Sequence, residues 1–138
     1  MANVISMQDM RYLNLFGRIT HISTRFCFPY NEHVVFSVPI GLISKAVGEN
    51  GRNIKKLSEI LGKRVKVVPS PRGIQDAEKF LEKVVSPTQF KDIEILDDEI
   101  IITAGIQNKA ALLGRNKRRL IELQKIVKNF FGKDLRII

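Results

Sequence analysis

Two glycines spaced three residues apart, Gly48 and Gly51, interrupt the stretch AVGENGRNIKKL. Apolar residues precede them, and a basic segment with helical periodicity follows them. Glycine has no Cβ and adopts positive φ angles, so such a loop lets a ligand approach the main chain closely. The free N–H groups and the dipole at the start of a following helix attract anions. The residue types and their spacing therefore indicate a loop that binds phosphate.

Cationic and apolar side chains flank this first loop, Gly48-Glu49-Asn50-Gly51. The candidate binding residues outside the loop are Lys45, Val47, Arg52, Ile54, Lys55, Lys56, Arg64 and Lys66. The cations suit a phosphate backbone, and the apolar pair Val47 and Ile54 suits a narrow groove for unpaired bases.

A plain helix C-cap followed by a turn is the alternative interpretation, because glycine is common at helix ends. Three features favour binding. The loop has the fuller pattern V-G-x-x-G-x-x-I, it lies in a β-α-α-β frame, and it occurs twice.

The second occurrence belongs to an internal repeat. HVVFSVPIGLISKAVG ends at Gly48, and EIIITAGIQNKAALLG ends 66 residues later at Gly114. Lys117 stands where the second glycine is expected, so we expect a degenerate loop that still adds electrostatic affinity. Its candidate binding residues are Lys109, Gly114, Arg115, Asn116, Lys117, Arg118 and Arg119. A solvated cationic face without a ligand remains the alternative.

The elements that position both loops are predicted from periodicity and turn signals. In the first copy we expect a helix over 7–18 with Ser6 as its N-cap, a hairpin from 21–28 and 33–39 with PYNE as the turn, helices at 41–47 and 52–61, and a strand at 64–68. In the second copy we expect a helix at 74–84, strands at 90–96 and 99–104, two helices around Gly114, the last of them longer than in the first copy, and a strand at 134–138.

The repeat and the linker PSPRG divide the chain into modules at 1–70 and 71–138. Each module reads α-β-β-α-α-β, an α+β arrangement of a three-stranded sheet with helices packed on one face. Within the helix at 52–61 we expect Ile54, Leu57, Ile60 and Leu61 to share the buried side.

The charge balance points to a polyanionic partner. There are 23 basic and 14 acidic residues, a formal charge of +9. The segment from Asp76 to Glu99 contains eight acidic and three basic residues, so the positive charge of the chain is concentrated near the loops. The acidic stretch is read either as a solvated surface or as a docking surface for a basic partner.

Nothing in the sequence forms a recognisable catalytic set. His21, His33 and Cys27 have no zinc-like spacing, and Cys27 is read as a buried, inert thiol. We therefore expect no enzyme, no cofactor and no metal. No apolar stretch reaches the length of about 20 residues that a membrane span needs, so we expect a soluble, cytoplasmic protein without a membrane partner.

AVGENGRNIKKLSEILGKRVKVV resembles the KH signature, and the order α-β-β-α-α-β is that of the type II KH fold. Two such modules in tandem resemble the archaeal NusA-like transcription factors. The resemblance implies a protein that binds single-stranded RNA, namely the nascent transcript, during transcription elongation or termination, with RNA polymerase as a candidate partner. We also expect a monomer. It carries clamp roles to Gly48, Glu49, Asn50 and Gly51, with Val47 and Ile54 supporting the groove, and in the second copy to Gly114, Arg115 and Asn116. Glu49 departs from the family, in which a cation is more usual.

Two other functions stay open. One is a helix-turn-helix-like binder of duplex DNA, which also joins two helices through a glycine-containing turn. The other is an assembly protein associated with the ribosome or polymerase that contacts RNA only incidentally.

Overall fold

The computed structural model describes residues 7–138, which divide into two compact units between Ser70 and Pro71. We call residues 7–70 the N-terminal unit and residues 71–138 the C-terminal unit. Across this described range the chain forms six α-helices and two three-stranded sheets, so the predicted α+β class is confirmed. No helix within residues 7–138 is long and apolar enough to cross a membrane.

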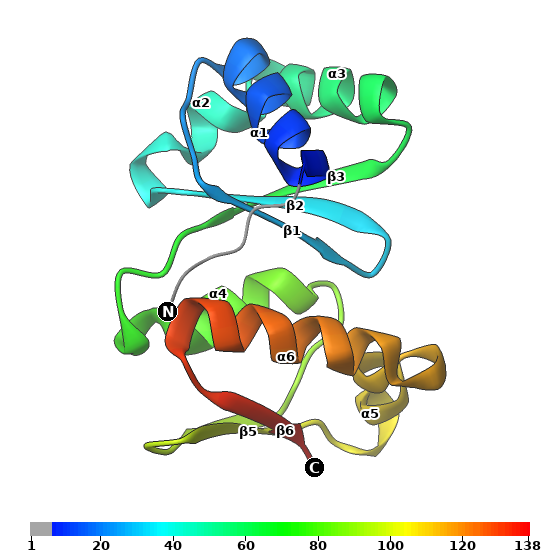
Figure 1. The fold of residues 1–138 in the computed structure, drawn as a ribbon. Coiled ribbons are helices and arrows are strands. Elements are labelled where there is room, and N and C mark those ends of the chain that lie inside the picture. The colour runs from blue at the N-terminus through cyan, green and yellow to red at the C-terminus, as the bar shows by residue number, and fades with distance from the viewer. Residues whose placement is uncertain (1–6) are drawn as a thin grey trace. The chain divides into compact units, whose positions relative to one another are not determined.

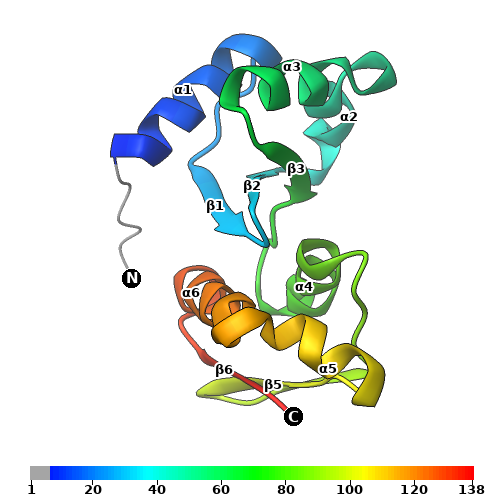
Figure 2. The ribbon, with the colours of Figure 1, turned by 90° about the vertical axis from the view of Figure 1, so that its right-hand side faces the viewer.

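In the N-terminal unit three helices lie on one face of a three-stranded sheet (Figures 1 and 2). The elements are α1 (Met7–Thr20), β1 (Phe26–Tyr30), β2 (His33–Val38), α2 (Ile43–Val47), α3 (Arg52–Leu61) and β3 (Arg64–Pro69). The sheet order is β1-β2-β3, with β1 antiparallel and β3 parallel to the central β2. A parallel β2–β3 pair needs a crossover connection, and α2, the glycine loop and α3 form it.

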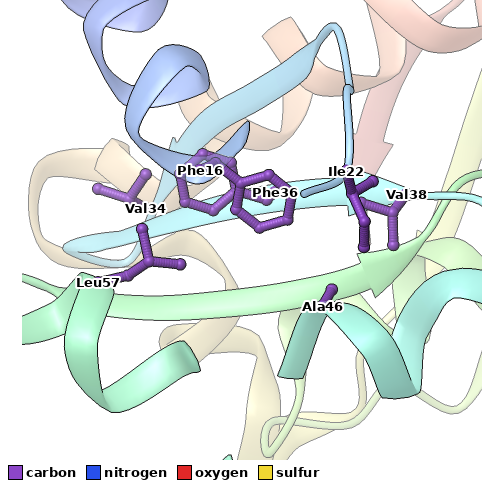
Figure 3. Packing of buried hydrophobic residues seen from close by; sticks show 7 residues of the cluster. All are labelled: Phe16, Ile22, Val34, Phe36, Val38, Ala46 and Leu57. Atoms are coloured by element: carbon purple, nitrogen blue, oxygen red, sulfur yellow. The ribbon is translucent and has the colours of Figure 1, made fainter. Parts of the chain in front are cut away.

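The core of this unit lies between β2 and the helices. Val34, Phe36 and Val38 alternate along β2 and face the helices, where they meet Phe16 of α1, Ile22, Ala46 of α2 and Leu57 of α3 (Figure 3). The rings of Phe16 and Phe36 stack with centroids 4.4 Å apart. Each helix therefore places at least one fully buried side chain against the strand.

The first hairpin and α3 differ in part from the sequence predictions. Residues 21–25 were expected in the first strand, but β1 begins only at Phe26. Pro29 and Tyr30 belong to β1, and the turn consists only of Asn31 and Glu32, both with positive φ. β1 is an edge strand, which tolerates proline because one of its sides carries no ladder. Ile60 was expected on the buried side of α3 but is 56% exposed. The Ser6 N-cap lies outside the described residues.

The C-terminal unit repeats the arrangement. Its elements are α4 (Ala77–Val85), β4 (Asp92–Ile95), β5 (Glu99–Thr103), α5 (Ile106–Leu113), α6 (Arg118–Phe131) and β6 (Asp134–Ile137). The order is β4-β5-β6, with β4 antiparallel and β6 parallel to β5. As predicted, the last helix is longer, with 14 residues in α6 against ten in α3.

Buried residues of this second core come from the helices and the central strand. Its fully buried side chains include Phe80, Leu81, Ile100, Ile102, Leu112 and Leu123. Phe130 and Phe131 pack around Phe80 at centroid distances of 4.7 and 6.0 Å and stay partly exposed.

Leu57→Ala should lower the free energy of unfolding by about 2–5 kcal/mol, because it leaves a cavity in a close-packed core. Ile60→Ala, on the same helix but exposed, should change it by less than about 0.5 kcal/mol. Urea unfolding followed by circular dichroism measures both. Equal losses would show that Ile60 is buried in solution.

Candidate nucleic-acid interface

The first loop is built from three backbone conformations in series. α2 ends at Val47, and Gly48 (φ 81°, ψ 167°) turns the chain. Asn50 (φ 55°, ψ 28°) and Gly51 (φ 73°, ψ 20°) are left-handed, after which α3 begins at Arg52. The Gly48 N–H donates to the Ser44 carbonyl at 3.0 Å, and the Gly51 N–H donates to the Gly48 carbonyl at 3.1 Å. The loop is therefore a defined turn.

The two glycines of this loop serve different needs. A Cβ at Gly48 would lie 3.0 Å from the Asn53 side chain and 3.1 Å from its backbone nitrogen. A Cβ at Gly51 would meet no atom within 4 Å. Gly48 is thus required by packing and by its φ and ψ, whereas the left-handed conformation of Gly51 favours glycine without requiring it and leaves open space above the start of α3.

The second loop has the same backbone conformation although one glycine is missing. Gly114 (φ 76°, ψ 173°), Asn116 (φ 55°, ψ 30°) and Lys117 (φ 59°, ψ 26°) reproduce the three conformations of the first loop. The Gly114 N–H donates to the Ala110 carbonyl at 2.9 Å, and the Lys117 N–H donates to the Gly114 carbonyl at 3.1 Å. The substitution that makes the sequence degenerate does not change the turn. A left-handed lysine costs about 1–2 kcal/mol, which the surrounding hydrogen bonds must offset.

One side chain in each unit ties the start of the second helix back to the end of the first. The Asn53 amide donates to the Lys45 carbonyl at 3.1 Å. Its counterpart 66 residues on is Arg119, whose Nη1 donates to the Ala111 carbonyl at 2.9 Å. We call this bond the clasp. Sequence reasoning missed Asn53 and treated Arg119 as a free cation. An alignment of the two copies places these residues at matching positions, but it does not show that both make the same hydrogen bond.

The cations next to the first loop point into solvent. Arg52, Lys55 and Lys56 are exposed, and Lys45 is exposed with its Nζ 3.5 Å from the His21 carbonyl. Gly51 offers no side-chain cap, so the first turn of α3 keeps its positive end accessible. Within residues 7–138 the ion pairs Arg72–Asp76, Lys128–Asp134 and Arg136–Glu99 lie in other segments, so this loop can accept an anion without breaking any of them.

The second loop is similarly open. Lys109, Arg115, Asn116, Lys117 and Arg118 are exposed, while Arg119 is half-buried by its clasp. Lys117 provides no side-chain cap to α6. The structure therefore brings four exposed cations of the predicted set to this loop and gives the fifth, Arg119, a structural bond.

Arg64 and Lys66 do not lie at the first loop. Arg64 begins β3, beyond the C-terminal end of α3, and α3 has ten residues, which span about 15 Å. Lys66 is half-buried in the middle of β3, opposite Val35 of β2. Both residues follow α3 closely in the sequence, which suggested that they lie near the first loop. The length of α3 keeps them away from it.

The apolar neighbours of the first loop are partly accessible. Val47 ends α2, Ile54 lies in the first turn of α3, and both are half-buried. At the matching positions of the second loop, Leu113 and Leu120 are half-buried as well. Glu49 and Asn50 are exposed at the tip of the first loop. Each loop thus combines an exposed polar tip with a partly open apolar flank.

Cys27 and His33 belong to the two strands of the first hairpin, β1 and β2. A cavity of about 250 Å³ between α1 and the first hairpin is lined by residues that include Tyr12, Cys27 and His33. His33 Nδ1 donates to the Asn31 carbonyl at 2.8 Å. Burial, with a smaller contribution from the charge of Asp9, raises the pKa of Cys27 to about 12. Within residues 7–138, no three His, Cys, Asp or Glu side chains gather as a metal site would require.

Comparison with known proteins gives relatives but no family model that matches the chain. The chain is 26% identical over 133 residues to the probable transcription termination protein NusA of Methanocaldococcus jannaschii, covering 93% of this chain and 71% of the relative. It is 23% identical over 137 residues to the protein of the same name from Halococcus morrhuae, covering 97% of this chain and 96% of the relative. A third relative of that name, from Methanococcus vannielii, is 24% identical over 64% of this chain and 50% of its own length. The predicted resemblance to archaeal NusA-like proteins is thereby confirmed.

A solved structure shares the fold. The crystal structure of APE1850 matches with a TM-score of 0.70 and 24% sequence identity, covering 97% of this chain and 99% of that chain. The arrangement of helices and strands along nearly the whole chain is therefore one already seen by crystallography.

Arg119→Ala should loosen the second loop, because it removes the clasp to the Ala111 carbonyl. We expect a loss of about 1–2 kcal/mol in stability and faster hydrogen exchange at the Gly114 amide. The matched control is Arg118→Ala, which removes an exposed neighbour of equal charge. The role assigned to Arg119 would be wrong if the two variants exchanged at the same rate.

Cys27 should react slowly in the folded protein. With a pKa of about 12, almost none of the thiol is thiolate at pH 8. Alkylation by iodoacetamide at that pH should be at least about 100-fold slower than for glutathione, and should approach the glutathione rate in urea. Mass spectrometry against time gives both rates, and rapid labelling of the folded protein would contradict an inert thiol.

Proposed function

We propose that this protein is a non-enzymatic transcription factor that binds single-stranded RNA through two tandem type II KH modules, residues 1–70 and 71–138. The observation that carries the proposal is that the same turn occurs in both modules, at Gly48–Gly51 and at Gly114–Lys117. Both turns have the same backbone conformation, each precedes an uncapped helix, and each is bordered by exposed cations. The relatives named as probable transcription termination proteins support transcription as the process.

In the first module the phosphate backbone would cross the start of α3. The open space above Gly51 admits it, and the positive end of the α3 dipole favours it, although the Arg52 N–H itself donates to the Glu49 carbonyl. Arg52, Lys55 and Lys56 would neutralise adjoining phosphates, and Lys45 would add charge from the end of α2. Val47 and Ile54 would border the groove for the bases, because single-stranded RNA is read through unpaired bases placed beside such a loop.

In the second module Gly114 and Asn116 would shape the turn while Arg115 and Lys117 contact phosphate directly. Lys109 and Arg118 would extend the cationic face, and Arg119 would hold the turn in place. Arg64 and Lys66 are outlying members of the proposed interface, because an RNA strand would have to follow α3 along its length to reach them. The proposed RNA is a nascent transcript, which brings RNA polymerase close as a partner.

Gly51→Asp should weaken binding of single-stranded RNA at least about tenfold while the fold survives. The substitution fills the open space with negative charge, and Asp tolerates a left-handed conformation better than most residues. Gly62→Asp is a matched control: Gly62 also has a positive φ (66°) and open surroundings, but it lies at the other end of α3. Fluorescence anisotropy measures affinity, and thermal unfolding checks the fold. Equal RNA affinities of the two variants would show that this loop does not bind the phosphate backbone.

Binding to duplex DNA separates the proposal from its rivals. At physiological salt, the protein should bind single-stranded RNA more tightly than duplex DNA of the same sequence and length. A preference for the duplex would favour a helix-turn-helix-like reader. Retention on the ribosome or polymerase after nuclease treatment, without affinity for free RNA, would favour an assembly protein.

A further inference from the structure

The two loops have the same backbone conformation but opposite net charges. Inside the first loop the only ionisable side chain is Glu49, whereas the second loop contains Arg115 and Lys117. All three are exposed. The tips therefore carry formal charges of −1 and +2. One of the two positive charges belongs to Lys117, which replaces the second glycine.

The helices that flank the loops do not produce this contrast. Around the first loop the flanking cations are Lys45, Arg52, Lys55 and Lys56. Around the second they are Lys109, Arg118 and Arg119, with Glu122 at the position that matches Lys56. The flanks of the first loop are thus the more basic, and Arg119 is already engaged by a carbonyl. The second loop differs in having its cations at the tip.

Position decides how much each charge contributes to phosphate binding. Physiological salt screens charges beyond about 8 Å, so cations at the turn act on a phosphate more strongly than cations further along a helix. At the first tip, Glu49 repels the same phosphate that the helix flank attracts.

Lys117 need not obstruct the approach of the phosphate. It has nearly the conformation of Gly51, and at Gly51 a Cβ would meet no atom within 4 Å. A lysine side chain built in that direction extends into solvent, where it can reach a phosphate as a point charge. The clasp from Arg119 helps to hold the turn in a conformation that lysine alone disfavours.

We propose that the second loop, Gly114–Lys117, is the tighter phosphate-binding site of the two, with Lys117 a phosphate-binding residue and Glu49 the residue that weakens the first loop. This inference rests on the proposed binding of single-stranded RNA. The glycine count of the two loops alone suggests the opposite order.

Reciprocal substitutions at the matching positions test the order. Lys117→Gly gives the second loop its second glycine and removes one of its two positive charges, and Gly51→Lys removes a glycine from the first loop and adds one positive charge. With a labelled single-stranded RNA of about 20 nucleotides, Lys117→Gly should weaken binding at least about threefold and lower the salt slope by about 0.7. Gly51→Lys should tighten binding by a similar factor. Lys125→Ala, which removes an exposed charge further along α6, should change affinity less than Lys117→Ala.

The outcomes separate the inference from the function beneath it. Unchanged or tighter binding by Lys117→Gly, or weaker binding by Gly51→Lys, would overturn the inference, because glycine would then matter more than charge. A second pair, Glu49→Arg and Arg115→Glu, should tighten and weaken binding respectively, and the reverse would also overturn it. If the unmodified protein shows no salt-dependent affinity for single-stranded RNA, the proposed function itself fails.

Discussion

The reversal of the chain between two consecutive helices is the constraint on which both units depend. α2 must end, turn and restart as α3 within four residues, so that β3 can return parallel to β2. Such a turn leaves carbonyls at the end of the first helix without intrahelical partners. The clasp satisfies one of them, and the Gly48 N–H satisfies another. Since Ala46 and Leu57 on either side of the turn are fully buried, an error in the turn would displace the core.

Two different side chains meet this constraint in the two units. Asn53 reaches its carbonyl with a short amide, and Arg119 reaches the matching carbonyl with a guanidinium. The glycines at Gly48 and Gly114 are common to both because a Cβ there would come within about 3 Å of the clasp residue and its backbone. Gly51 has no such neighbour, which is why its counterpart can be a lysine. The duplicated turn therefore constrains some positions tightly and leaves others free to change charge.

The distribution of ion pairs agrees with a surface kept open at the loops. The pairs Arg72–Asp76, Lys128–Asp134 and Arg136–Glu99 lie outside both turns, and each involves exposed side chains. Exposed pairs of this kind contribute little to stability, about 0–1 kcal/mol each. Folding therefore relies on the two apolar cores, while the cations at the loops remain available to a polyanion.

The sequence by itself determined the element order, the repeat, the α+β class and both turns, because these follow from local periodicity, glycine positions and residue spacing. It located α3 at Arg52–Leu61 and predicted that the last helix would be one turn longer. It could not place Ile60, which periodicity put on the buried face although more than half of its surface is exposed. Only the tertiary structure separated Arg64 from the loop, gave Arg119 its carbonyl partner and kept the second turn intact without its glycine. These depend on how neighbouring elements are arranged in space and on backbone angles, and a linear pattern of residue types contains neither.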